Sequence, residues 1–131
     1  MIPLVRSLLP IVLLMAAAMS QAAGLGKLTV NSRLGQIFDA DIDLVSVQPG
    51  EADTLSARVA APEAFRSSRL EYRPVLRLLR FAVDKRASGE PYLKVTSSAP
   101  VNEPSVDALI ELTWLQGRVQ RQYSILLDPP R

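Results

Sequence analysis

The sequence predicts an all-β protein, an immunoglobulin-like antiparallel β-sandwich of about seven strands with one short connecting helix. Apolar residues recur at every second position in several short segments. A side-chain period of two is typical of strands with one face toward a core. Gly, Pro and Asn turn signals separate these segments at short intervals, which is typical of sandwiches.

Three segments in the first half show the alternation, and we expect a strand at each of residues 28–30, 38–44 and 55–59. In the second segment the polar positions are Asp39, Asp41 and Asp43, which predicts an acidic outer face. Their spacing resembles the start of a calcium loop, but Leu44 stands where a glycine should follow and no glutamate closes the loop. We therefore expect a solvated strand face rather than a metal site.

One stretch favours a helix. Pro62 suits a first helical position and Glu63 places an acid in the first turn, so we expect a short helix over 62–68. Pro74 argues against one uninterrupted helix from Pro62 to Arg80, because proline breaks a helix interior.

The second half predicts two hairpins. Strands at 81–83 and 93–95 would flank a turn at 87–89, and strands at 106–114 and 119–127 would flank Gln116-Gly117. With that second turn the apolar faces meet in register, pairing Trp114 with Val119, Ile110 with Tyr123, and Val106 with Leu127. The same spacing places Trp114 in the core.

Arg121 breaks this pattern, because the register puts it on the apolar face opposite Leu112. A charge there must be paired, solvated at a sheet edge or part of a contact surface. Glu103, held between prolines in P-V-N-E-P at 100–104, is the candidate partner. We expect Glu103 and Arg121 to form a structural pair, with a role in contacting a partner protein as the alternative.

The N-terminus predicts a secretory signal peptide at 1–22. Arg6 supplies a short positive region, residues 8–18 form an apolar run, and Ser20-Gln21-Ala22 fits a small-x-small cleavage site. An uncleaved membrane anchor is the alternative, although such a run reaches only about 17 Å as a helix, against a hydrocarbon core of about 30 Å. No other apolar run approaches spanning length, so we expect one exported domain over 23–131 without a membrane span.

Composition argues against several classes of protein. Without residues 1–22, 14 basic residues face 13 acidic ones, a net charge of +1 that is too balanced for a nucleic-acid binder. The sequence has no cysteine, so the fold must rely on packing rather than disulfides. It also lacks histidine, the commonest general base and metal ligand. Glu103 and Glu111 are available as a glycosidase-type pair, but nothing in the sequence brings them together. We expect no enzymatic activity, no cofactor and no bound metal.

Five arginines form the densest basic series: Arg66, Arg69, Arg73, Arg77 and Arg80. Such a series can bind an anionic envelope polymer through peptidoglycan carboxylates or phospholipid headgroups. The plainer interpretation is a solvated, partly neutralised face, and Pro74 breaks the helical spacing that one continuous stripe needs.

Several motifs run through the chain: G-L-G-K-L-x-V-x-S-x-L-G-Q at 24–36, P-E-A-F at 62–65, P-V-N-E-P at 100–104, E-L-x-W at 111–114, G-R at 117–118 and R-x-Y-x-x-L-L-D-P-P at 121–130. Together they resemble the N-terminal domain of the FimV family, bacterial envelope proteins linked to type IV pilus assembly and twitching motility. The resemblance covers nearly the whole exported domain. It departs from the family pattern at Ser105, where a larger apolar residue is expected, and at Gln122, where an acid is usual.

The resemblance implies a periplasmic location and a non-catalytic role in protein contacts that support pilus or envelope assembly. The partners would be envelope or pilus-assembly proteins, with peptidoglycan as the second candidate through the arginine series. In the family this domain is usually followed by a proline-rich linker, a LysM peptidoglycan-binding module, a transmembrane helix and a cytoplasmic repeat region. The resemblance is to the first of these parts, so it implies neither LysM-based binding nor cytoplasmic signalling for this chain. The chain is either a stand-alone domain or a piece of a longer protein.

Overall fold

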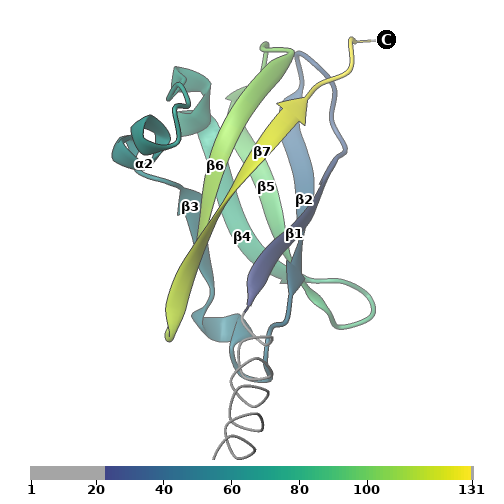
Figure 1. Ribbon diagram of the computed structural model, residues 1–131. Coiled ribbons are helices and arrows are strands. Elements are labelled where there is room, and N and C mark those ends of the chain that lie inside the picture. The colour runs from purple at the N-terminus through teal and green to yellow at the C-terminus, as the bar shows by residue number, and fades with distance from the viewer. Residues whose placement is uncertain (1–22, 131) are drawn as a thin grey trace, which may run out of the picture.

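Two antiparallel sheets make up the fold. The computed structural model describes residues 23–130, and the predicted signal peptide at 1–22, with its alternative as a membrane anchor, lies outside them. The four-stranded sheet has the order β1-β2-β5-β4, formed by β1 (Gly24–Val30), β2 (Ile37–Val45), β5 (Pro91–Pro100) and β4 (Leu79–Lys85). The three-stranded sheet has the order β3-β6-β7, formed by β3 (Ser56–Val59), β6 (Ser105–Trp114) and β7 (Gly117–Leu126). The two sheets face each other as the layers of a sandwich (Figure 1).

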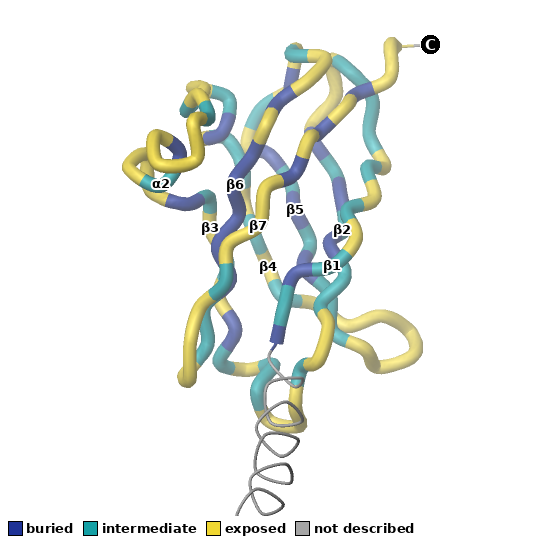
Figure 2. Tube along the Cα trace, viewed as in Figure 1, coloured by how far each residue is buried: buried dark blue, intermediate teal, exposed yellow. Residues whose placement is uncertain are grey.

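The core lies between the sheets and follows from the alternation in the sequence. On β2 the buried residues Phe38, Ala40 and Ile42 alternate with the aspartates, and on β6 the residues from Val106 to Leu112 that face inward are buried as well (Figure 2). Burial of apolar surface contributes about 25 cal/mol per Å², so this shared interior is the main source of stability. The predicted all-β sandwich of seven strands is confirmed, and so is the position of each predicted strand.

The β6–β7 hairpin keeps the predicted faces but not the predicted register. Trp114 lies opposite Gly117, Leu112 opposite Val119, and Val106 opposite Ile125, so the pairing is shifted by two residues. The turn is formed by residues 115–116 rather than 116–117. A shift of two preserves the period of two, so every inward side chain stays inward. Trp114 is half-buried rather than enclosed, and its ring packs against the core and over Gly117.

The predicted helix is present as α2 (Pro62–Ser67), which begins at its proline and buries Phe65 completely. Pro74 begins a separate 3₁₀ helix, η3 (Pro74–Leu78), so the predicted interruption is confirmed. A second 3₁₀ helix, η2 (Ala52–Thr54), precedes β3. None of the helices within residues 23–130 has the length and apolar character needed to cross a membrane.

At one end of the sandwich, three segments that are far apart in sequence are joined by backbone hydrogen bonds. In the turn after β1, the Leu34 N–H donates to the backbone carbonyl of Asp128 at 2.9 Å, and the Gly35 N–H donates to the backbone carbonyl of Val101 at 2.8 Å. The Leu127 N–H donates to the carbonyl of Pro104 at 2.9 Å. Gly35 has a φ of +86°, a left-handed conformation that glycine adopts without strain. The motif segments 24–36, 100–104 and 121–130 therefore meet in one network.

The close approach of β1 to β2 occurs at Gly26. The register of this pair shifts between Leu25 and Leu28, as at a β-bulge. A Cβ at Gly26 would lie 3.0 Å from the carbonyl oxygen of Asp43 and 3.1 Å from its Cβ. At Gly24 the nearest atom would be a methyl group of Val45 at 3.2 Å. Gly26 is therefore confined by backbone, and Gly24 by a side chain that can rotate.

We expect Gly26→Ala to destabilise the fold more than Gly24→Ala. The methyl group added at position 26 meets the Asp43 backbone, so β1 must move away from β2 at a cost of about 1–3 kcal/mol. Such a cost lowers the melting temperature of a domain of this size by about 4–8 °C per kcal/mol. Thermal unfolding followed by circular dichroism measures both variants. A Gly24→Ala protein that melts as low as Gly26→Ala would contradict the expectation.

Candidate functional site

The structure separates Glu103 and Arg121, the two residues that the sequence suggested as a pair. Arg121 is on β7, opposite Ile110 of β6. Its Nη1 donates to the carbonyl oxygens of Leu25 and Gly26 at 2.9 and 3.1 Å. Glu103 lies in the loop before β6 and forms an ion pair with Arg73 instead. The expected Glu103–Arg121 pair is not formed, because β1 brings two carbonyl acceptors within reach of Arg121.

Arg121 and Tyr123 close the seam between the two sheets. The hydroxyl of Tyr123 donates to the carbonyl of Gly26 at 2.6 Å, and the Arg121 guanidinium lies over the Tyr123 ring, 5.0 Å from its centroid. These contacts join β7 to β1, edge strands of different sheets that share no ladder. Arg121 is exposed, so its charge is solvated at the sheet edge, one of the three outcomes that the sequence analysis allowed. Burial raises the pKa of Tyr123, which keeps its hydroxyl a protonated donor.

Glu103 links the loop before β6 to the segment before η3. Nη2 of Arg73 lies 3.0 Å from Oε2 of Glu103. This contact has the distance of an ion pair but not the angle of a hydrogen bond, so Oε2 has no hydrogen-bond donor among the described residues. The Arg73 side chain is 44% exposed, and solvent screening limits such a pair to about 1 kcal/mol or less.

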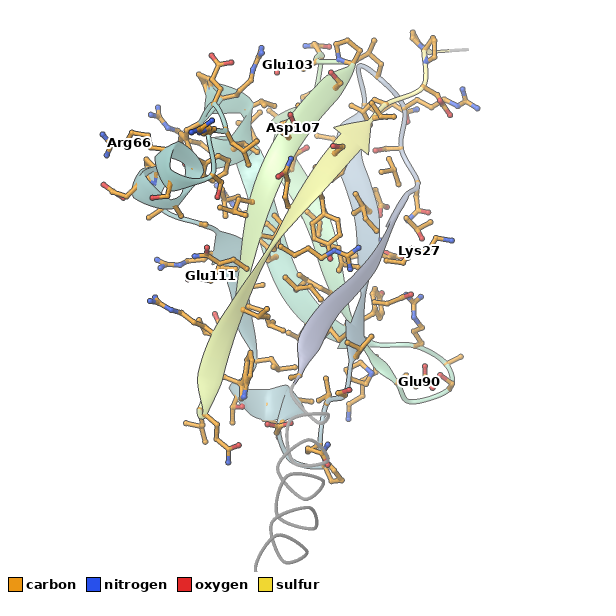
Figure 3. All side chains as sticks on the ribbon, viewed as in Figure 1. Lys27, Arg66, Glu90, Glu103, Asp107 and Glu111 are labelled. Atoms are coloured by element: carbon orange, nitrogen blue, oxygen red, sulfur yellow. The ribbon has the colours of Figure 1, made fainter. Side chains whose placement is uncertain are left out.

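The five arginines of the basic series are all exposed, and Arg66 projects from the outside of α2 (Figure 3). Two of them are partly neutralised, since Arg66 lies 3.7 Å from Glu63 and Arg73 pairs with Glu103. Three form no ion pair with another described residue: Arg69, Arg77 and Arg80. The interruption between α2 and η3 divides the series, so it forms a group of separate charges rather than one stripe.

Glu111 is the centre of a buried polar cluster that the sequence analysis did not predict. Its side chain is only 3% exposed, although it lies on the outward face of β6. Its cross-strand neighbours are Arg58 on β3 and Gln120 on β7. Nε of Arg58 donates to Oε2 at 2.7 Å, and Nε2 of Gln120 donates to Oε1 at 2.9 Å. Nη1 of Arg118 lies 3.9 Å from Oε1. We call these four residues, Arg58, Glu111, Arg118 and Gln120, the Glu111 cluster.

The hydrogen bonds of the Glu111 cluster favour the charged carboxylate. The bond from Gln120, followed by that from Arg58, lowers the pKa of Glu111 below its ordinary value of 4.5, against the opposing effect of desolvation. The cluster thereby couples all three strands of the smaller sheet. Glu111 stands between the apolar residues Ile110 and Leu112, and an acid in such a run was the available signal in the sequence. Its partner Arg58 lies 53 residues away, and periodicity does not reveal such a pairing.

The aspartates of β2 form ion pairs on the outer face of the larger sheet. Lys94 of β5 contacts Asp39 and Asp41, and Arg86 contacts Asp43 at 2.6 Å. The hydrogen bond between Asp39 and Lys94 lowers the pKa of the acid and raises the pKa of the amine. Within residues 23–130, no group of acidic side chains is arranged to hold a metal ion. The three aspartates therefore act as a charged strand face.

Glu103 and Glu111 are the carboxylates that the sequence offered for glycan cleavage. Glu103 precedes β6 at one end of the sandwich, and Glu111 lies well along the strand (Figure 3). From Ser105 to Glu111 an extended strand rises about 20 Å. Paired glycosidase carboxyls lie about 5–9.5 Å apart, so these two residues do not form such a pair.

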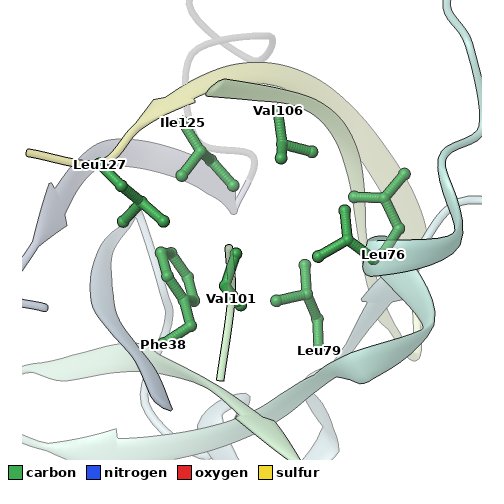
Figure 4. Close-up of a pocket in the computed structure, with 8 residues that line it drawn as sticks. Phe38, Leu76, Leu79, Val101, Val106, Ile125 and Leu127 are labelled. Carbon is green, nitrogen blue, oxygen red and sulfur yellow. The ribbon is translucent and has the colours of Figure 1, made fainter. Parts of the chain in front are cut away.

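Two hollows among the described residues offer few polar groups to a small ligand. An apolar cavity of about 20 Å³ lies at one end of the core, between Phe38, Val101, Val106 and Leu127 (Figure 4). It has room for about one water molecule but no polar partner for it. A depression of about 380 Å³ lies between the end of β2 and the start of β5, with Glu90 as its one titratable group. Neither place brings together two groups that could exchange protons with a substrate.

The fold and its surfaces define a class of protein: an immunoglobulin-like β-sandwich domain with charged groups on its outer faces, many of them paired with one another. The family model described as the FimV N-terminal domain Ig-like domain matches residues 23–130. The chain therefore belongs to the FimV N-terminal domain family, and the resemblance seen in its motifs is confirmed.

Curated relatives of this chain are much longer than it is. The motility hub protein FimV of Pseudomonas aeruginosa is 35% identical over 116 residues, both in strain PAO1 and in strain UCBPP-PA14. The match covers 88% of this chain but 13% of either relative. No solved structure matches the chain.

We expect Arg121→Ala to cost more stability than Arg77→Ala. The first change removes hydrogen bonds from a charged donor to two carbonyls of β1, worth about 1–2 kcal/mol in sum at this partly exposed site. The second removes the contact of Arg77 with the Tyr72 ring, at 6.0 Å, and an exposed contact of this kind contributes about 0.5 kcal/mol. Urea denaturation of both variants measures the difference, and equal midpoints would refute this assignment of Arg121.

We expect Glu111→Gln to lower the stability at neutral pH and to weaken its dependence on pH. The pKa of Glu111 is lowered in the folded protein, so its charge stabilises the fold above the ordinary value of 4.5. That contribution is lost as the pH falls through the folded pKa. The difference from wild type should be about 1–2 kcal/mol near pH 7 and should shrink toward about pH 3.

Urea denaturation of wild type and Glu111→Gln across this pH range gives the measurement. Asp107→Asn is the control, because Asp107 is an exposed acid on the same strand. A difference that widens on acidification would show that the charged form of Glu111 does not stabilise the fold.

Proposed function

We propose that this chain is a non-catalytic periplasmic protein-interaction domain that supports type IV pilus or envelope assembly and motility. Membership of the FimV N-terminal domain family over residues 23–130 carries the proposal. The name of the curated relatives, motility hub protein FimV, supports the link to motility. The signal peptide predicted at 1–22 supports export.

The distribution of polar groups supports contacts with other macromolecules rather than chemistry on a small molecule. The core cavity is apolar and about 20 Å³ in volume, whereas ligand pockets have volumes of about 300–1,000 Å³. The depression of about 380 Å³ between β2 and β5 reaches that range, but Glu90 is its one titratable group. Charged side chains are instead ordered on the outer faces, as at Glu111 and Asp43. Sheet faces that carry hydrogen-bonded charged side chains suit the recognition of another protein surface.

The test of this function is deletion of the gene in the bacterium that encodes the chain. We expect smaller twitching zones and less pilin on the cell surface, with recovery after complementation. A fusion to alkaline phosphatase, an enzyme that is active only after export, tests the location. Normal twitching and normal surface pilin in the deletion strain would rule out the role in pilus assembly, and an inactive fusion would rule out the periplasm.

A second candidate function is the binding of peptidoglycan or another anionic envelope polymer. The observation that favours it is the exposure of Arg69, Arg77 and Arg80, which pair with no acid among the described residues. Purified sacculi should retain the protein at low salt and release it at high salt, because exposed charges are screened. No retention at low salt, or equal retention when these three arginines are replaced by glutamine, would exclude this candidate.

A further inference from the structure

The Glu111 cluster holds two arginines on the outer face of the three-stranded sheet. Arg58 binds Glu111 through Nε, so its Nη1 and Nη2 donate to no described residue, and its side chain is 65% exposed. Arg118 lies 3.9 Å from the same carboxylate, beyond hydrogen-bond distance, and its side chain is 71% exposed. Both guanidinium groups therefore keep N–H groups that no residue within 23–130 engages and that a ligand can bind.

The buried carboxylate prepares this face for an anion. Glu111 orders Arg58 before any ligand arrives, which lowers the side-chain entropy that binding would cost. Two arginines and one glutamate leave a net charge of +1 in the cluster. Asp107 is another acid on this face of β6, but it lies four residues away, about 13 Å along the strand, and its carboxylate accepts a hydrogen bond from Ser124.

The hairpin tip next to Arg118 adds apolar surface. Leu115, in the turn between β6 and β7, is 86% exposed. Arginine is enriched at the centres of protein interfaces. Free guanidinium N–H groups beside an exposed leucine suit a protein segment with both carboxylates and an apolar side chain. A glycan exposes mainly hydroxyl groups and offers less to Leu115.

We propose that the outer face at Arg58 and Arg118, together with the tip at Leu115, docks an acidic segment of a partner protein. This inference rests on the proposed function as a protein-interaction domain. Nη1 and Nη2 of Arg58 bind one partner carboxylate through two parallel N–H···O bonds. Arg118 binds a second carboxylate, and Leu115 packs against an apolar side chain of the same segment.

The test is a titration of the protein with a synthetic peptide in which glutamate and leucine alternate, followed by NMR of the arginine Nε–H signals. The Nε–H of Arg58 is hydrogen-bonded to Glu111, which slows its exchange and makes it a local probe. We expect this signal to shift on binding. Arg118→Gln should weaken the affinity about tenfold, which corresponds to about 1.4 kcal/mol. This variant leaves the bond between Arg58 and Glu111 in place, so the fold is kept.

Arg69→Gln is the matched control, because it removes the same charge from an exposed site outside the cluster. We expect it to bind like wild type, and Leu115→Ser to weaken binding severalfold. An equal loss of peptide affinity in Arg118→Gln and Arg69→Gln would show that the peptide is held by general electrostatic attraction, which would overturn the proposal. The proposal would also be overturned if the Arg58 Nε–H signal did not shift with the peptide. The same holds if soluble muropeptides shifted that signal at lower concentrations than the peptide does.

Complementation of the deletion strain separates this proposal from the proposed function. A gene with both Arg118→Gln and Leu115→Ser should restore less twitching than wild type. Full recovery would mean that this surface is not used, while the role in pilus assembly would stand on the deletion phenotype itself.

Discussion

The closure of the sandwich along one side depends on how β1 is held against β7. The chain has no cysteine to link the two sheets, and these edge strands share no ladder. Side chains of Arg121 and Tyr123 join them by hydrogen bonds to the carbonyls of Leu25 and Gly26. The irregular register of β1 and the missing side chain at Gly26 bring those carbonyls into place. An arginine on an apolar face is thus explained by its position at the edge of the sheet.

Periodicity predicted the strands and their inward faces, because burial acts on each strand separately. It did not fix the register of the β6–β7 hairpin, since the predicted and observed pairings differ by two residues and bury the same side chains. The partner of Arg121 was missed for another reason: Leu25 lies 96 residues away. The environment of Glu111 likewise required the pairing of β3 with β6. Local pattern therefore predicted the layers, and long-range pairing decided the polar contacts.

The charged regions differ in how their charges are compensated. On the larger sheet, Lys94 and Arg86 are engaged by the aspartates of β2. Around α2 and η3, Arg69, Arg77 and Arg80 are exposed and pair with no acid among residues 23–130. On the smaller sheet, a buried acid orders an exposed arginine without using all its donors. Ordered donors that remain free are best prepared for selective binding, because they combine low entropic cost with defined geometry.

The seam between β1 and β7 also has a mechanical consequence. The described chain enters at one end of the sandwich and leaves at the opposite end, and both strands run in the same direction between these ends (Figure 1). A tension applied across residues 23–130 would pull β1 and β7 past each other along their length. The bonds from Arg121 and Tyr123 to β1 would then be loaded in shear together, rather than opened one after another. Together with the strand ladders and the core, these two side chains would resist the sliding of β1 along β7.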